Sequence, residues 1–347
     1  MAKTETLFPI HPQHSPGPLA RAAAQAPLHS TGCLTEYRPL PTRTLISKVV
    51  SRRGLPFTHA INPYRGCEFA CRYCYARYTH EFLEFHDPVD FERKIYFKQN
   101  VEALATRELA RLKPGTQIAL GTATDPYQPL ERSEHVTRSI LQAFARTRGF
   151  SLGIVTKSTL LLRDLDLLTQ VARRHTLTIH ITITTLNHGL ARILEPRAPR
   201  PDLRVQALAR LRQAGLRAGV LCSPIMPAIN DSPASMRAVA RMAAEADACF
   251  FAAGALFLKP CSQPTFFAFV AEHFPAQLEN YKRRYGSNAF AAPQYRQRIA
   301  DLVAALRREF KLGDRFGGRS GLAILPAPQL EQQPWLPFPV AGKATSA

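Results

Sequence analysis

No stretch of this sequence is long and apolar enough to cross a membrane. The most apolar run, residues 248–258, is too short to span a bilayer and is flanked by Asp247 and Lys259. The first residues carry no apolar stretch behind a basic end, so no signal peptide is expected. These absences argue against a membrane protein and predict a soluble, cytoplasmic one.

Acidic residues are also scarce. The 347 residues include 26 Asp and Glu against 45 Lys and Arg, a formal net charge of +19. A surface this basic attracts polyanions, so nucleic acid is the first partner to consider. However, the arginines are spread through every helix-like segment rather than massed in one run, and solvated helices alone produce such a balance. Charge therefore leaves nucleic-acid binding open.

Cysteine is sparse and unevenly placed. Three of the seven cysteines, Cys67, Cys71 and Cys74, stand in one short stretch with the spacing C-x3-C-x2-C. Clustered cysteines fit a reducing compartment and metal binding better than disulfides. The others are expected to be small buried side chains without a ligand role, namely Cys33, Cys222, Cys249 and Cys261.

The cysteine stretch lacks a fourth cysteine, and this absence limits what it can bind. A structural zinc site takes four ligands, and a [4Fe–4S] cluster is usually held by four cysteines. Three thiolates on a four-iron cluster leave one iron open to a substrate or cofactor. The alternative is a zinc site in which His80 supplies the fourth ligand. The spacing favours the iron–sulfur cluster and leaves the zinc site as the alternative.

Strand-like and helix-like segments alternate along the chain. Strands are predicted between 44 and 61 and at 117–120, 151–156, 177–185, 218–225 and 249–258. Helices are predicted at 97–112, 136–148, 165–174, 203–214 and 233–246, and after the last strand at 264–285 and 293–312. Connections this short permit only parallel, right-handed crossovers. The predicted fold class is α/β, a partial (β/α)6 barrel of the TIM type with C-terminal helices.

Domain boundaries follow from this pattern. Residues 1–45 carry many Pro, His, Ala and Ser without a sustained period and are expected to form a disordered or irregular tail. The barrel is expected to cover 46–260 and a helical extension 261–325. A Pro-rich, irregular tail is expected at 326–347.

The cysteine stretch resembles the signature of the radical S-adenosylmethionine (SAM) superfamily, C-x3-C-x-aromatic-C, with Tyr73 in the aromatic position. The blocks INPYRGC (61–67), GTATDPYQP (121–129) and TKS (156–158) are similar to the spore photoproduct lyase-like branch. Within that branch they resemble bacterial proteins often described as DNA repair photolyases. The resemblance covers roughly residues 40–320, and the superfamily shares the partial barrel.

This resemblance implies a radical SAM enzyme of the lyase-like type. Cys67, Cys71 and Cys74 would hold a [4Fe–4S] cluster, and SAM would bind its open iron. Reductive cleavage of SAM would give a 5′-deoxyadenosyl radical that abstracts hydrogen from a substrate. An electron donor such as flavodoxin or ferredoxin is the implied partner.

The resemblance also implies SAM contacts at the strand ends, where sites in such barrels gather. Thr124 and Asp125 stand where many radical SAM enzymes place a Gly-Gly-Glu turn that receives the SAM ammonium, although Asp-Pro-Tyr is also an ordinary turn. Lys157 follows the third strand and suits the SAM carboxylate or ribose, or it is simply exposed there. Thr182 and Thr184 are expected to face the barrel interior near the ribose, although threonine is also a good strand former.

Further candidates follow from position alone. Arg65, Glu131 and Asp231 are interior candidates, and Ile225, Met226 and Pro227 either pack near the adenine or serve packing alone.

One position departs from the family pattern. Spore photoproduct lyases place a hydrogen-donating cysteine immediately before the position of Thr124, where this chain has Ala123. Repair of the thymine photoproduct by that route is therefore not expected. The leading substrate is a nucleic-acid base, which must be extruded if it lies in a duplex. The alternatives are a radical SAM enzyme acting on a protein or tRNA, and a zinc-stabilised nucleic-acid-binding module without catalysis.

Overall fold

The computed structural model describes residues 16–49 and 55–315, and six parallel strands form its central sheet. These strands are β4 (His59–Ile61), β7 (Gln117–Leu120), β8 (Ser151–Thr156), β9 (Thr176–Thr182), β10 (Ala218–Ile225) and β11 (Phe251–Ala255). They are neighbours in the same order in which they follow along the chain. At the outer edge of β4, the short strand β3 (Ile46–Lys48) pairs in antiparallel orientation.

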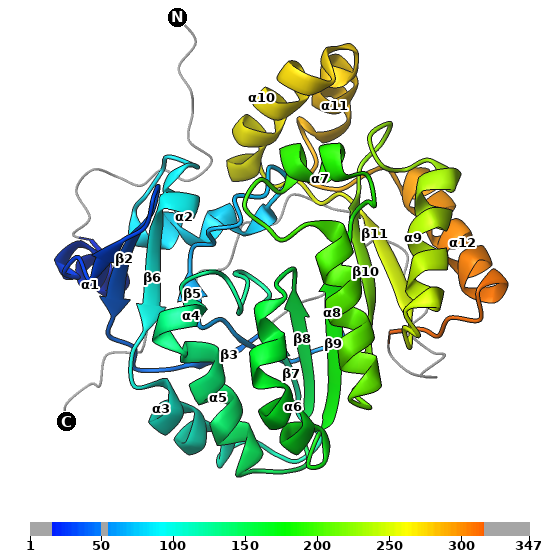
Figure 1. The fold of residues 1–347 in the computed structure, drawn as a ribbon. Coiled ribbons are helices and arrows are strands. Elements are labelled where there is room, and N and C mark those ends of the chain that lie inside the picture. Colours follow the sequence, from blue (N-terminus) through cyan, green and yellow to red (C-terminus); the bar gives the residue numbers. More distant parts are fainter. Residues whose placement is uncertain (1–15, 50–54, 316–347) are drawn as a thin grey trace, which may run out of the picture.

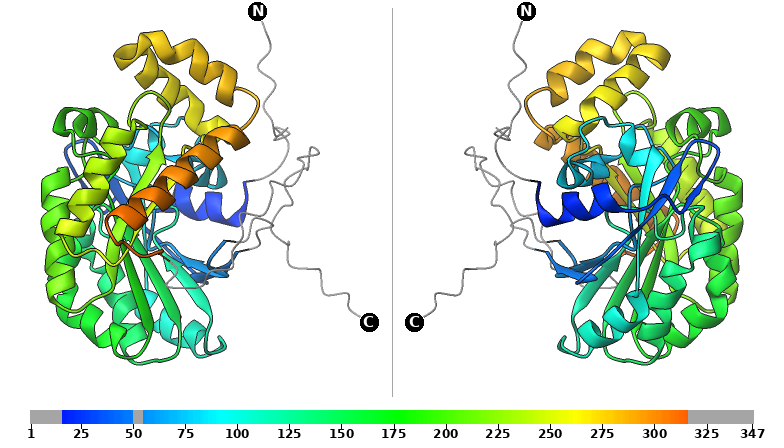
Figure 2. Two further views of the ribbon diagram at one scale, coloured as in Figure 1. Left: turned by 90° about the vertical axis from the view of Figure 1, so that its right-hand side faces the viewer. Right: turned by 90° about the vertical axis from the view of Figure 1, so that its left-hand side faces the viewer.

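Helices cover one face of this sheet. When successive parallel strands are joined by right-handed crossovers and added in one direction, the crossover helices lie on the same side of the sheet. These helices are α3 (Val101–Leu109), α4 (Glu131–Glu134), α5 (Val136–Ala145), α6 (Leu165–Ala172), α8 (Pro201–Gln213) and α9 (Pro233–Glu245). The short helix α7 (His188–Leu194) lies instead at the rim of the sheet, where Leu194 packs with the three cysteines. Figures 1 and 2 show the curved sheet with the helices outside it and α1 on the opposite side. The predicted partial (β/α)6 barrel is confirmed.

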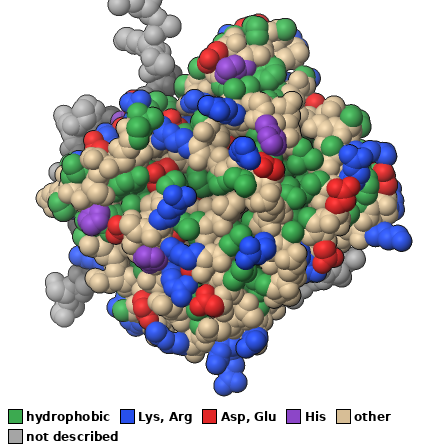
Figure 3. Space-filling model, viewed as in Figure 1, with side chains coloured by type: hydrophobic (Ala, Val, Ile, Leu, Met, Phe, Trp, Pro, Cys, Tyr) green, Lys and Arg blue, Asp and Glu red, His purple; other side chains and the backbone are tan. Residues whose placement is uncertain are grey.

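The helix-covered face carries many cations. In Figure 3, which views the molecule from this side, Lys and Arg side chains are scattered over the surface rather than gathered in one patch. The charge on this face therefore marks no single binding surface.

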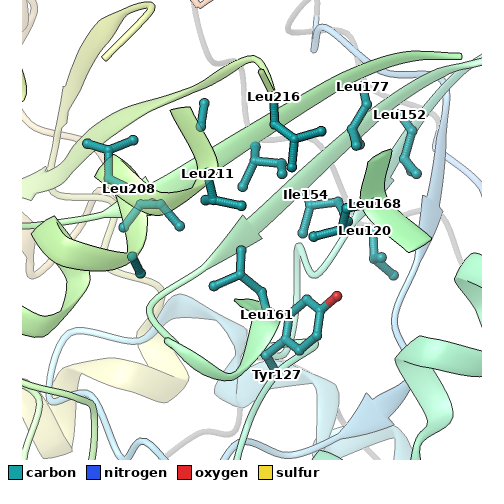
Figure 4. Close-up of a cluster of buried hydrophobic side chains, with 14 of the residues drawn as sticks. Leu120, Tyr127, Leu152, Ile154, Leu161, Leu168, Leu177, Leu208, Leu211 and Leu216 are labelled. Atoms are coloured by element: carbon teal, nitrogen blue, oxygen red, sulfur yellow. The ribbon is translucent and has the colours of Figure 1, made fainter. Parts of the chain in front are cut away.

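The main core lies between the sheet and these helices. Leu152 and Ile154 of β8 pack with Leu177 of β9 and with Leu208 and Leu211 of α8 (Figure 4). Side chains alternate along a strand, so residues at odd positions of β9 join this core and those at even positions face the inner side of the sheet.

The N-terminal part of the chain is more ordered than predicted. The expected irregular tail is wrong for residues 16–45, which form α1 (Pro18–Gln25), β1 (Ser30–Thr31) and β2 (Glu36–Leu40). These strands join β6 (Lys94–Lys98) and β5 (Tyr64–Arg65) in a second sheet with the order β1-β2-β6-β5. Ala23 and Leu40 pack there against Tyr96. The partners lie more than 50 residues away, so no local period reveals them; the predicted 326–347 tail lies outside the described residues.

The C-terminal helices follow β11. They are α10 (Gln263–His273), α11 (Leu278–Tyr285) and α12 (Pro293–Glu309), and the helix expected at 264–285 is interrupted at Pro275. Arg307 of α12 donates a hydrogen bond to the Phe251 carbonyl at 2.7 Å, and Gly313 bridges to Phe250. The C-terminal segment therefore covers the free edge of β11. Along 16–49 and 55–315, no helix is long and apolar enough to cross a membrane.

The inner face of the sheet is tightly packed at Gly219 of β10. A Cβ atom built there would lie 2.5 Å from the Phe250 carbonyl oxygen and 2.6 Å from its ring. At Gly153 of β8, the nearest atom to such a Cβ is 3.9 Å away. Gly219→Ala is therefore expected to lower the free energy of unfolding by about 1–3 kcal/mol, measured by urea denaturation.

The matched control is Gly153→Ala, which is expected to leave stability unchanged or raise it by about 0.5 kcal/mol. Equal losses from the two substitutions would contradict the packing described at Phe250.

Candidate active site

The stretch with the three cysteines, residues 67–74, is called the cysteine loop and follows the first parallel strand closely. β4 leads through β5 to Gly66, whose φ is +86°. A Cβ at this position would meet the Ile95 side chain and the Phe91 carbonyl oxygen at 2.8 Å. Glycine thus allows the close turn that brings Cys67 to the carboxyl-end rim of the sheet.

Backbone hydrogen bonds hold the cysteine loop to distant segments. The Cys67 N–H donates to the Phe91 carbonyl at 2.9 Å, and the Arg72 N–H donates to the Leu194 carbonyl at 2.9 Å. The loop is therefore fixed between α2 (Asp90–Arg93) and the end of α7.

Side chains add further anchors on either side of the loop. The buried Arg77 donates to the Cys71 carbonyl at 3.3 Å and forms an ion pair with Glu92 at 2.7 Å. The Ser262 hydroxyl donates to the Cys74 carbonyl at 2.7 Å. These contacts fix the backbone at two of the three cysteines, so their thiols are held in place without a disulfide.

The three cysteines lie near one another in an apolar environment. Cys67 and Cys71 are buried, Cys74 is half-buried, and all three are free. They contact one hydrophobic cluster that also contains Phe69 and Tyr73. Burial raises the pKa of the Cys67 thiol well above its usual value and that of Cys71 to about 12. Three neighbouring thiols in apolar surroundings are the donor type that holds an iron–sulfur cluster.

His80 does not join the cysteines. Its Nε2 is hydrogen-bonded to the Lys94 carbonyl at 2.9 Å, and its ring packs edge-on to Phe91 at 5.3 Å. Burial lowers the pKa of His80 to about 4. His80 is therefore not placed to supply the fourth ligand of the alternative zinc site. Among the described residues, no three His, Cys, Asp or Glu side chains, the three cysteines included, are arranged for a single metal ion.

Thr124 and Asp125 lie just past β7, the second parallel strand, and their side chains form hydrogen bonds within the protein. The Thr124 hydroxyl donates to the Gly66 carbonyl at 2.6 Å. The Asp125 carboxylate accepts from the Thr156 hydroxyl at 2.6 Å and from the Lys157 N–H at 2.8 Å. These two side chains tie the loop after β7 to the cysteine loop and to the end of β8.

Tyr73, Lys157 and Thr184 are brought together around Glu195, which sequence reasoning missed. The Tyr73 hydroxyl donates to the Glu195 carboxylate, and the Thr184 hydroxyl does so at 3.3 Å. The Lys157 ammonium lies 5.6 Å from the centre of the Tyr73 ring. Thr184 lies just beyond β9, so its position comes from the loop rather than from the strand alternation.

Glu195 is paired with Arg204, a second residue that sequence reasoning missed. Their charged atoms are 2.5 Å apart and both side chains are buried. Arg204 also donates to the carbonyl of Thr182 at 3.1 Å, and the Thr182 side chain is buried. Burial alone would raise the pKa of the Glu195 carboxyl, but Arg204 and Lys157 outweigh it and the pKa is lowered.

A second network links the cysteine loop to the block at 121–131. The Glu68 N–H donates to the Gln128 side chain at 2.9 Å, and the Glu68 carboxylate accepts from Leu130 N–H at 2.9 Å and from the Tyr37 hydroxyl at 2.6 Å. Gln128 belongs to the TDPYQP block (124–129). The block indicated that Gln128 lies near the site, but no local pattern indicated its contact with Glu68.

The further interior candidates have structural contacts. Glu131 accepts from the Tyr64 hydroxyl and pairs with Arg163 at 2.9 Å. Asp231 pairs with Arg298 of α12 at 2.7 Å. Met226 is fully buried in the cluster that holds the cysteines, whereas Glu131 and Asp231 join helices to the barrel.

The Radical SAM superfamily model matches residues 61–239, which include the cysteine loop and β4 to α9. This chain therefore belongs to the radical SAM superfamily. Among its relatives, the uncharacterized protein Rv2578c of Mycobacterium tuberculosis is 33% identical over 271 residues, 78% of this chain and 79% of the relative. The uncharacterized protein MJ0683 of Methanocaldococcus jannaschii is 30% identical over 173 residues, 50% of this chain and 62% of the relative.

Solved structures of spore photoproduct lyase share the fold. A cysteine-to-serine mutant of that lyase superimposes with a TM-score of 0.59 at 18% identity, covering 79% of each chain. The lyase complexed with dinucleoside spore photoproduct superimposes with a TM-score of 0.57 at 16% identity, again covering 79% of each chain. At these identities the likeness shows the fold, and the predicted resemblance to this branch is confirmed at that level.

The Glu195–Arg204 pair generates a stability prediction. Arg204→Met leaves a buried carboxylate without its main partner, so unfolding free energy is expected to fall by about 3–5 kcal/mol, measured by urea denaturation. The matched control is Arg200→Met, which breaks an exposed pair with Asp202 at 2.8 Å near the start of the same helix. The control is expected to cost at most about 1 kcal/mol, and similar losses in both variants would contradict the role given to Arg204.

Proposed function

We propose that this chain is a radical SAM enzyme in which Cys67, Cys71 and Cys74 hold a [4Fe–4S] cluster. The observation that supports this proposal is the set of three free thiols, fixed by backbone hydrogen bonds in an apolar environment at the carboxyl-end rim of the sheet. Three cysteines rather than the usual four would hold the cluster, which leaves one iron with a free coordination position for SAM. When bound, the cluster and SAM supply a 5′-deoxyadenosyl radical to the substrate.

The residues around Glu195 are proposed to bind SAM. Lys157 offers an ammonium group to the SAM carboxylate or ribose, and the neighbouring Cys71 and Glu195 raise its pKa against the effect of burial. Tyr73, Thr182 and Thr184 provide the wall of this site next to the cysteines. Thr124 and Asp125 act through the backbone: their hydrogen bonds to Gly66, Thr156 and Lys157 N–H set the shape of the turn that faces SAM.

A nucleic-acid base is the proposed substrate. The chain has a formal net charge of +19, and a structure with the same fold was solved with dinucleoside spore photoproduct. Ala123 occupies the place of the hydrogen-donating cysteine, and its N–H is bound to the Asn62 side chain at 2.8 Å. An alanine methyl group cannot replace a thiol as a hydrogen donor, so spore photoproduct repair by that route is not proposed. An electron donor such as flavodoxin or ferredoxin is the proposed redox partner.

The cluster assignment is tested by Cys71→Ala. After anaerobic reconstitution with iron and sulfide, the variant is expected to lose brown colour and most of its iron. With dithionite and SAM, wild-type protein is expected to form 5′-deoxyadenosine, detected by chromatography, and the variant at least about a hundredfold less. Cys249→Ala is the control and is expected to retain both properties. Full iron and activity in Cys71→Ala would refute the assignment, as would a colourless wild-type protein that holds zinc.

The SAM site is tested by Lys157→Met, which keeps the length of the side chain and removes its charge. The reconstituted variant is expected to keep its iron and to bind SAM about tenfold more weakly, a loss of about 1.4 kcal/mol, measured by calorimetry. Lys113→Met removes an exposed lysine and serves as the control for net charge. An unchanged dissociation constant for SAM in Lys157→Met would show that Lys157 does not bind SAM.

A further inference from the structure

Two cations lie on one face of the small second sheet beside the cysteine loop. In the β5–β6 pair, Arg65 stands opposite Tyr96. Lys98 is two residues farther along β6, so it is the diagonal neighbour of Arg65 on the same face. Tyr96 packs against α1, whereas Phe97 on the other face joins the main core. The two cations therefore face away from the main core, on the α1 side.

Neither cation has a carboxylate partner within the described parts of the chain. Arg65 and Lys98 form no ion pair and no side-chain hydrogen bond with residues 16–49 or 55–315, and the Arg65 Nε is buried without a partner. Glu108 is the acidic group that acts on Lys98, but its carboxylate accepts the backbone N–H groups of Leu45 at 3.1 Å and Ile46 at 2.8 Å.

The remaining neighbours do not neutralise the charge. Tyr78 and His80 interact electrostatically with Arg65, and neither side chain is a carboxylate. Burial, followed by repulsion from Arg65, lowers the pKa of Lys98 to about 7. Partly buried cations without anions reduce the stability of the free protein, and an anionic ligand would remove this cost.

We propose that Arg65 and Lys98 bind a phosphate group of a nucleic-acid strand and so place that strand beside the cysteine loop; this inference rests on the proposed function. The planar guanidinium fork matches phosphate oxygens, and the ammonium adds a second charge. Arg65 is two residues before Cys67 in the sequence, so the anion is held next to the proposed reaction centre.

Exposed aromatic side chains on the segment that follows Cys74 favour a nucleic-acid strand over a small anion. Tyr78 lies beside Arg65, and its ring is 6.0 Å from that of Phe82. Phe82 is 45% exposed and Tyr75, which follows Cys74, is 38% exposed. Proteins bind single strands by combining cations that contact the backbone with aromatic rings on which bases stack.

The first test measures binding of a short fluorescein-labelled single-stranded DNA to reconstituted protein without SAM, by fluorescence anisotropy. Arg65→Gln and Lys98→Gln are each expected to weaken binding about tenfold and to reduce the slope of log Kd against log salt by about 1. The matched controls are Arg241→Gln and Lys113→Gln, which remove the same charge from exposed positions elsewhere. Equal losses in all four variants would mean diffuse attraction and would overturn the proposal.

A second measurement separates a binding role from a structural one. Lys98→Met keeps the apolar stem and removes an unpaired, repelled charge, so the melting temperature of the ligand-free protein is expected to rise by about 2 °C or more. Inorganic phosphate is expected to stabilise the wild-type protein more than this variant. A lower melting temperature of the ligand-free variant would indicate a structural lysine and would overturn the proposal.

The outcomes distinguish this proposal from the proposed function. If wild-type protein forms no 5′-deoxyadenosine while Arg65→Gln and Lys98→Gln still lose DNA affinity selectively, the enzyme assignment fails and the phosphate site stands. If 5′-deoxyadenosine forms and the variants bind DNA like the wild type, the phosphate site is wrong. If inorganic phosphate or AMP binds at these residues but DNA affinity does not depend on them, the site takes a small anion and the nucleic-acid assignment is overturned.

Discussion

The buried carboxylate of Glu195 is kept ionised by positive side chains and hydrogen-bond donors that come from four separate segments. Tyr73 comes from the cysteine loop, Lys157 from the end of β8, Thr184 from the loop after β9 and Arg204 from α8. The lowered pKa of Glu195 shows that these partners outweigh the cost of desolvation. The cysteine loop is thus placed by the same interaction that holds the strand ends together.

The order of the strands decides where this interaction occurs. Because β4, β7, β8 and β9 are parallel and adjacent in chain order, their carboxyl ends share one rim, and the loops that follow them meet there. Asp125 and Thr124 use that proximity to connect three successive strand ends. The hydrophobic cluster of the cysteines extends to Phe266 of α10 and Tyr281 of α11, so the helices after the barrel shield the same rim.

Local patterns were enough to predict the parallel sheet. The strands at 117–120, 151–156 and 218–225 have the expected bounds because each is an apolar run between turn residues. The second sheet was missed because β2 pairs with β6, far along the chain, and strand preference depends on such tertiary contacts. Glu195 and Arg204 were missed for a related reason: they flank a Pro- and Arg-rich stretch typical of an exposed turn, and burial is not a local property of the sequence.

The charges near the cysteine loop fall into two kinds, and the difference indicates which are available to ligands. Arg77 and Arg204 each have a buried carboxylate partner, so their charge is already used in holding the fold. Arg65 and Lys98 have none among the described residues, and the thiol of Cys67 has a raised pKa because burial disfavours its thiolate. Arg65 therefore remains available to an anionic ligand two residues from Cys67, whose thiol is neutral until a metal replaces its proton. A metal cluster at the cysteines and a substrate phosphate at Arg65 would then lie side by side.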